Sequence, residues 1–157
     1  MNKILLTAAA LLLSACGFHL KGNGGITKPL PYQTWSVNGN VLQEALENAL
    51  RRADGKPVET GAEAGVTVTG IETRRDIYTI TRTAHVNEYL LILRVEAQAT
   101  RNGAPVGPKL SALVQRTMDY ADSEVLGKAE EEQTIWSEMR TDAAEQIVRQ
   151  LTFLPKQ

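Results

Sequence analysis

The residue with the most distinctive chemistry is Cys16, the one cysteine among 157 residues. A basic residue, a short apolar run (4–13) and the small residues Ser14 and Ala15 precede it, in the order of a bacterial lipoprotein signal. We therefore predict that residues 1–15 are removed and that Cys16 is the lipid attachment site, carrying a thioether-linked diacylglycerol and an acyl chain on its amine. Two or more chains hold a protein stably on a membrane. The alternative is an ordinary secretory signal with a chance cysteine.

The residue after the cysteine is Gly17 rather than aspartate, and by similarity to sorted lipoproteins this favours the outer membrane over the inner one. Removal of residues 1–15 leaves 142 residues, enough for one domain with a single core. The loss of one lysine changes the formal charge from −1 to −2, which excludes the electrostatic footprint of a nucleic-acid-binding protein. No cysteine is left for an intrachain disulfide, so packing must stabilise the fold.

Residue types that carry catalysis or bind metals are sparse. His19 and His85 have no second imidazole or thiolate at ligand spacing, so we expect no metal site. Serine-nucleophile, P-loop and dinucleotide motifs are also missing from the sequence, so we expect no cofactor. The glutamates at 130–132 would point about 100° apart on a helix, where acidic residues in early turns suit the helix dipole. We therefore expect no enzymatic activity; the alternative is a glycan hydrolase acting through Glu131 or Glu132.

Hydrophobic spacing divides the mature chain into a tether and one domain. Residues 16–31 are rich in glycine and proline, which predicts an extended, lipidated tether ahead of a domain at 32–157. The predicted elements of this domain are a strand at 32–37, a helix at 41–53, strands at 66–80, 86–100 and 109–120, and a helix from a Ser123 cap to about Leu151. Asn40 is predicted to cap the first helix, with Gln43 completing a capping box.

Each predicted helix has a single apolar stripe, so both should cover one face of the sheet. This predicts an α+β fold, a two-layer sandwich with two helices on one face of a four-stranded mixed sheet in the order β-α-β-β-β-α. We expect Pro105 and Pro108 to keep the last strand connection out of the sheet. We also expect Glu145 and Arg149 to form an ion pair one helical turn apart. The stripe of the last helix is predicted to bury Val125, Ala129, Trp136, Met139, Ala143, Ile147 and Leu151.

Chain direction brings several basic residues to one end of this domain. Arg82, in the turn between the first two long strands, and Lys128, early in the last helix, should lie at the same end, with Arg116 a turn or so below as a possible supporting cation. Such cations would suit a phosphorylated, anionic ligand, although each alone could be a solvated surface charge. Leu90 and Ile92 should lie near this end on the sheet face away from the helices, where something outside the domain must cover them.

Three blocks of the sequence, in this order, resemble the LptE family of lipopolysaccharide-assembly lipoproteins. The first block is residues 16–22, which are similar to the family's start except that Lys21 replaces the usual arginine. The second is Glu88-Tyr89 with the threonine-rich stretch before it, and the third is Lys128 with residues 138–147. The resemblance covers essentially the whole mature chain.

This resemblance implies a non-enzymatic outer-membrane lipoprotein that plugs a large β-barrel, helps the barrel to assemble, and binds lipopolysaccharide on its way to the cell surface. It implies a one-to-one complex and a ligand site at Arg82 and Lys128. Leu90 and Ile92 are then the expected barrel contacts. The alternatives are a periplasm-facing lipoprotein of another envelope machine and, in a different class, the cell-wall glycan hydrolase.

Overall fold

The structure, a computed structural model, describes residues 28–80, 86–120 and 125–155. Predictions that concern Cys16, Arg82, His85 and Ser123 lie outside the described residues. The elements in chain order are β1 (Thr34–Asn38), a 3₁₀ turn η1 (Asn40–Leu42), α2 (Gln43–Arg52), β2 (Lys56–Pro57), β3 (Ala64–Ile80), β4 (Val86–Arg101), β5 (Ala104–Pro105), β6 (Leu110–Asp119) and α3 (Val125–Leu151).

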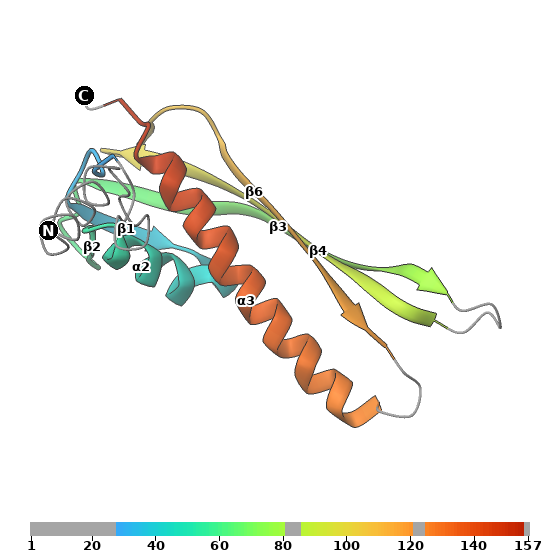
Figure 1. The fold of residues 1–157 in the computed structure, drawn as a ribbon. Helices are drawn as coiled ribbons and strands as arrows, with labels where there is room; N and C mark the ends of the chain where they lie inside the picture. Colours follow the sequence, from blue (N-terminus) through green and yellow to red (C-terminus); the bar gives the residue numbers. More distant parts are fainter. Residues whose placement is uncertain (1–27, 81–85, 121–124, 156–157) are drawn as a thin grey trace, which may run out of the picture.

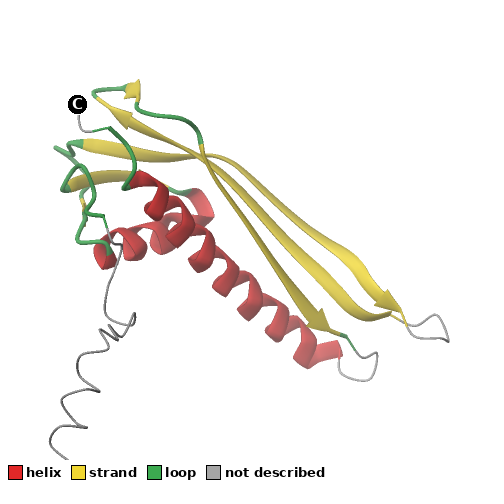
Figure 2. Ribbon diagram, turned by 45° about the horizontal axis from the view of Figure 1, so that its top comes forward, coloured by secondary structure: helices red, strands yellow, loops and turns green. Residues whose placement is uncertain are grey.

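One mixed sheet carries both helices on a single face, so the predicted two-layer α+β sandwich is confirmed (Figures 1 and 2). β1 runs parallel to β3 and to β2, whereas β3, β4, β5 and β6 pair antiparallel. The sheet has six strands rather than four, because β2 and β5 add two short pieces of two residues each.

The expectation that Pro105 and Pro108 keep the last connection out of the sheet was wrong for Pro105, whereas Pro108 does lie outside the strands. Pro105 belongs to β5 and lies opposite Thr100 of β4. Proline is tolerated at a sheet edge, because the N–H that it lacks is not needed there. The next residue continues the pairing, since the Val106 N–H donates to the Ala99 carbonyl at 2.8 Å.

The first helix also begins differently from the prediction. Asn40 has a φ of +51° and forms the 3₁₀ turn instead of capping the helix with its side chain. Gln43 does reach back to a free backbone donor, but to the Gly39 N–H, whose distance to Oε1 is 2.8 Å. The left-handed backbone at Asn40, which asparagine tolerates better than most residues, tightens the turn and moves the capping interaction by one residue.

The core lies between the sheet and the helices, as the alternation in β4 predicted. Leu91, Leu93 and Val95 are buried, and they face α3. Among the stripe residues whose side chains are described, Met139, Ala143, Ile147 and Leu151 are buried, all in the C-terminal half of α3, whereas the side chain of Val125 lies outside the description. Ala129 is exposed, so the predicted stripe was wrong there, and Trp136 is partly buried and packs against the core.

The distribution of buried side chains divides the molecule into two regions. We call base the end where β1, β2, α2 and the C-terminal half of α3 meet, and arm the part formed by residues 70–80, 86–96, 113–119 and 125–138. In Figure 1 the arm extends away from the base as long strands with the first half of α3 beside them. The expected Glu145–Arg149 pair is replaced by a link within the base, because Glu145 binds Arg52 of α2 at 3.0 Å.

Candidate functional site

Lys128 is the predicted ligand-binding residue that the structure describes, and it lies in the first turns of α3 at the far end of the arm. Its Nζ is 2.7 Å from Oε2 of Glu131, and its side chain is only 15% exposed. The stem is therefore packed on the protein surface, with the ammonium beside a more exposed carboxylate. An anion that binds Lys128 must share this ammonium with Glu131.

The elements that flank residues 81–85 reach the same end of the molecule as the start of α3. Figures 1 and 2 both show the outer ends of β3 and β4 and the first turn of α3 at one end of the long axis. The chain directions therefore agree with those predicted from the sequence. Arg82 itself lies outside the described residues, and its distance from Lys128 stays a prediction.

Arg116 is not brought to Lys128. It lies opposite Leu91 in the sheet register, on the helix side, and its guanidinium pairs with Asp142 of α3. Asp142 is fourteen residues beyond Lys128, which is about 21 Å along a helix. Arg116 thus links β6 to the middle of α3, and its role as a supporting cation has no geometric support.

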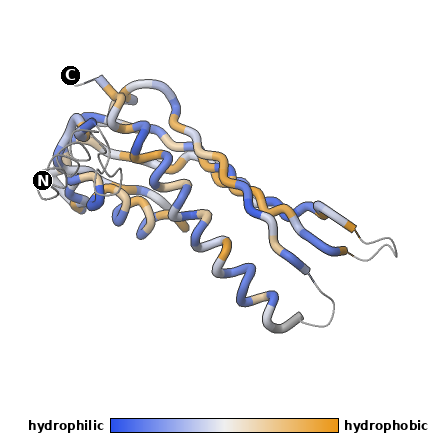
Figure 3. The backbone as a smooth tube through the Cα atoms, viewed as in Figure 1, coloured by the Kyte–Doolittle hydropathy of each residue, from blue (hydrophilic) through white to orange (hydrophobic). Residues whose placement is uncertain are grey.

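Leu90 and Ile92 lie on the open face of the sheet, away from the helices, and both are partly buried. Their register neighbours on β3 are Asp76 and Arg74, and those on β6 are Thr117 and Gln115. The pair is therefore a narrow apolar strip between polar rows rather than part of a broad apolar surface. Figure 3 shows the same mixture of hydrophobic and hydrophilic residues along the outer strands.

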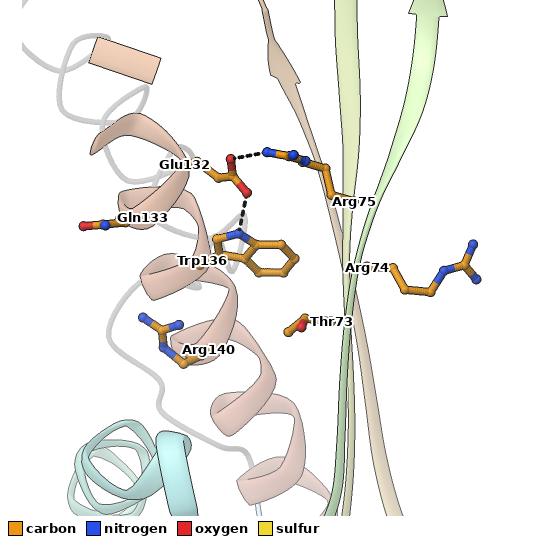
Figure 4. Close-up of a pocket in the computed structure, with 7 residues that line it drawn as sticks. All are labelled: Thr73, Arg74, Arg75, Glu132, Gln133, Trp136 and Arg140. Atoms are coloured by element: carbon orange, nitrogen blue, oxygen red, sulfur yellow. Dashed lines mark hydrogen bonds and ion pairs between the residues drawn. The ribbon is translucent and has the colours of Figure 1, made fainter. Parts of the chain in front are cut away.

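A cavity that the sequence did not indicate lies between β3 and α3 in the arm (Figure 4). It has a volume of about 660 Å³ and is lined by Thr73, Arg74, Arg75, Glu132, Gln133, Trp136 and Arg140. Volumes of this order are typical of pockets for small-molecule ligands.

One wall of this cavity is held by a chain of polar contacts centred on Glu132. Its carboxylate accepts hydrogen bonds from Arg75 at 3.0 Å and from the Trp136 indole N–H at 3.1 Å. The Arg75 guanidinium also lies 4.9 Å from the centre of the Tyr89 ring. The prediction of Trp136 as a core residue holds only in part, because its ring packs against the core but also forms a wall of an open cavity, and its N–H donates to Glu132.

The sequence contains a signal for this wall. Glu132, Trp136 and Arg140 follow each other at intervals of four, so they share one face of α3. Arg140 makes no ion pair with any residue that the structure describes, which gives the cavity a positive charge that is not compensated locally. The sequence does not show that Arg75, which lies 57 residues before Glu132 in the chain, completes the wall.

The glutamates considered for catalysis are engaged in structural contacts. Glu131 pairs with Lys128, and Glu132 accepts from Arg75 and Trp136. In the described ranges no three histidine, cysteine or acidic residues gather in a way that could hold a metal ion. The helices of those ranges also include none that is long and apolar enough to cross a membrane.

Comparison with known proteins agrees with this arrangement. The family model LptE, described as lipopolysaccharide-assembly, matches residues 32–151. The LPS-assembly lipoprotein LptE of Pectobacterium atrosepticum is 30% identical over 155 residues, covering 94% of this chain and 83% of that protein. Its counterpart in Yersinia enterocolitica is 28% identical over 153 residues, covering 94% and 73%.

Solved structures share the fold. Lipoprotein B of Nitrosomonas europaea aligns with a TM-score of 0.69 at 24% identity, over 87% of this chain and 90% of its own. A minor lipoprotein of Acinetobacter baumannii aligns with a TM-score of 0.68 at 22% identity, over 82% and 98%. Since the family model spans both helices and every strand of the sheet, the chain belongs to the LptE family of lipopolysaccharide-assembly proteins.

Proposed function

We propose that this protein is an outer-membrane lipoprotein that plugs the lipopolysaccharide-transport β-barrel, supports the assembly of that barrel, and binds lipopolysaccharide during its insertion. The match of the family model to residues 32–151 carries this proposal. The elongated form adds to it, because a long arm with polar outer strands fits a lumen better than a membrane interior. The role is binding and assembly rather than catalysis, in keeping with the ion pairs of Glu131 and Glu132.

The anchor and the domain have separate tasks in this proposal. Cys16 carries the lipid, residues 16–31 form the tether, and the domain at 32–157 provides the plug. The lipid holds the protein on the periplasmic side of the outer membrane while the domain enters the barrel. Replacement of Cys16 by serine should leave the precursor uncut and without acyl chains, which mass spectrometry of the N-terminal peptide measures. A mature start elsewhere would contradict the localisation.

The ligand site in this proposal consists of Arg82 and Lys128 at the far end of the arm, binding lipopolysaccharide phosphates. Lys128 is already 85% covered by its own chain, so a phosphate there meets a partly desolvated ammonium. Charge-assisted contacts of this kind are worth about 1.5–3 kcal/mol each. Glu131, the present partner of Lys128, is the group that the phosphate displaces or shares.

The experiment is a double substitution, Arg82→Asp with Lys128→Asp, in the purified full-length protein. Lipopolysaccharide binding should weaken by well over tenfold, because two attractive contacts become repulsive. The matched control is Lys56→Asp with Lys109→Asp, which alters two exposed cations outside the arm and should bind normally. Unchanged binding by the arm variant would contradict the site, and a joint loss of binding and of barrel complex would assign these residues a structural role.

A further inference from the structure

The outer part of β3 is an unpaired sheet edge. β1 pairs only with residues 64–67 of β3, so residues 68–80 have β4 on one side and no strand on the other within the described chain. A long free edge presents backbone donors and acceptors that can pair with another chain.

Two hydrogen bonds fix the direction of the backbone groups in β4. The Val106 N–H donates to the Ala99 carbonyl and the Tyr120 N–H to the Asn87 carbonyl, both at 2.8 Å. Odd-numbered residues of β4 therefore face β5 and β6, and even-numbered residues face β3. The Ser111 N–H of β6 supports this pattern. The pattern directs this N–H away from β4, and the N–H donates to the Gln150 side chain at 3.1 Å.

The same pattern identifies the free groups of β3. Even-numbered residues of β4 lie opposite Gly70, Glu72, Arg74 and Asp76, whose backbone groups are thus used within the sheet. The alternate residues direct their N–H and C=O groups to the open edge; they are Ile71, Thr73, Arg75 and Ile77. Eight aligned backbone groups are therefore available to an added strand.

Exposed apolar side chains gather at the outer end of this edge. Ile77, Tyr78 and Ile80 are 60%, 58% and 61% exposed. Ile77 lies opposite Tyr89 on the helix side, and Ile80 also points to the helix side, because the side chain of the preceding Thr79 meets Glu88 on the open face. An added strand would cover this apolar end while it pairs with the free backbone groups. The β6 edge differs, because Gln150 caps its start and only Leu113 is comparably exposed.

The charges along the β3 edge are compensated within the chain. Arg74 pairs with Asp76 at 2.7 Å, Arg75 with Glu132 at 3.0 Å, and Glu72 with Arg94 at 3.7 Å. An occupant of the edge therefore needs no charge to pair with the side chains of β3, and an uncharged polar acceptor is enough to meet Arg140 in the cavity. β-Branched and aromatic residues are the chemistry that pairs best with an isoleucine-rich and tyrosine-containing edge.

We propose that residues 70–80 of β3 bind an uncharged, extended segment of the barrel partner as an added strand, with alternate side chains of that segment entering the cavity beside Trp136. The choice of partner rests on the function proposed above. Backbone pairing provides the affinity in this mode of recognition, and the pocket beside the edge provides the specificity. Thr73 and Arg75 belong both to the free edge and to the cavity wall, so the two features form one surface (Figure 4).

A second copy of this chain fits the edge less well than a different protein. The antiparallel register centred on Thr73 places Glu72 opposite Arg74 of the second copy, which suits the charges. It also places Ile80 opposite Val66, whose edge β1 already occupies. In this register the exposed apolar end would thus stay uncovered, whereas an extended segment of another protein can continue over this end.

The test is the substitution Thr73→Pro in the full-length protein, expressed where its barrel is present. Proline removes one outward N–H and blocks the edge, but it is tolerated in an edge strand, so the chain should keep its unfolding midpoint. The matched control is Thr117→Pro, which makes the same change at an outward position of β6. We expect barrel recovery to fall at least tenfold for Thr73→Pro and to stay within twofold of wild type for Thr117→Pro.

A second measurement uses the wild-type protein, so its result does not depend on whether a variant folds. Hydrogen exchange of the wild-type peptide at 69–80 should slow at least tenfold in the barrel complex relative to the isolated chain, because the outward amides become bonded. Equal exchange in the two states, normal recovery of Thr73→Pro, or protection that appears in a dimer of this chain alone would overturn the proposal. Failure of the wild type itself to recover a barrel would instead overturn the proposed function, so the two failures are distinguishable.

Discussion

The base and the arm are built from the same sheet and the same long helix, yet they differ in what holds them together. The base encloses fully buried side chains such as Trp35, Leu46 and Leu50 between β1, α2 and the end of α3. In the arm, β3 is exposed along most of its length and is joined to α3 through the Arg75–Glu132 pair. Apolar burial thus stabilises both regions, since β4 and β6 also bury side chains in the arm, but along the arm β3 keeps backbone and side-chain groups available for partners.

The largest effect that tests this comparison is expected in the base. Trp35 is fully buried, its indole N–H donates to the Tyr32 carbonyl at 2.9 Å, and its ring packs edge-on against Tyr32. Trp35→Ala should lower the free energy of unfolding by about 3–5 kcal/mol, since it leaves a large cavity. In the arm, Tyr78→Ala should change this free energy by less than about 0.5 kcal/mol. Denaturant unfolding of both variants measures the contrast, and similar losses would remove the distinction between base and arm.

A second prediction concerns binding rather than stability, and here the larger effect is expected in the arm. Leu90→Asp with Ile92→Asp places two charges on the open face of the arm, where both side chains are partly buried among polar neighbours. Barrel recovery should fall more than tenfold while the domain still shows cooperative unfolding. The control is Ser111→Asp, on the same face near the base, which should leave recovery unchanged. An intact complex with the double variant would show that the barrel contacts another face.

A smaller effect on stability is expected where β3 is joined to α3 within the arm. Glu132→Gln weakens the acceptor shared by Arg75 and Trp136. The free energy of unfolding should fall by no more than about 1 kcal/mol, because ion pairs with exposed partners contribute little. The loss should also shrink in high salt. A loss of several kcal/mol would mean that the arm depends on this contact as the base depends on its core.

The smallest effect concerns pH in the base. The Gln43 side chain, which donates to Glu47 at 2.7 Å, lowers the pKa of Glu47 most, and Arg51 lowers it further, whereas burial acts in the opposite direction. A carboxyl whose pKa is lowered by folding adds stability above its unfolded pKa, and this contribution is lost as the pH falls. Wild type should therefore lose slightly more stability than Glu47→Gln between pH 7 and pH 3. An equal loss in both proteins would show that Glu47 does not contribute.

The sequence predicted the elements of both regions well but the contacts of the arm poorly. Alternation in β4 identified the buried face, because a strand placed beneath a helix must hide every second residue. The same reasoning failed for Ala129 and held only in part for Trp136, because helical spacing does not show that α3 leaves β3 uncovered along the arm. It also assigned Glu145 to Arg149, whereas Arg52 arrives from α2 by tertiary packing alone.

For the candidate site too, the position along the molecule could be predicted from the sequence, but the contacts could not. Chain direction was enough to place Lys128 at the far end of the arm, since the order and length of the strands decide where α3 begins. The Arg75–Glu132 link and the free edge of β3 were not predictable. They depend on how short β1 is relative to β3, and on where α3 crosses the sheet.

The base also joins the two ends of the described chain. Tyr32 donates its hydroxyl to the Pro155 carbonyl at 3.3 Å, and Leu154 is buried in the same core as Tyr32 and Trp35. During synthesis from the N-terminus onward, this core cannot close until Leu154 has been added. The arm strands, which are neighbours in sequence, have no such delay. The arm can therefore pair its strands before the core of the base is complete.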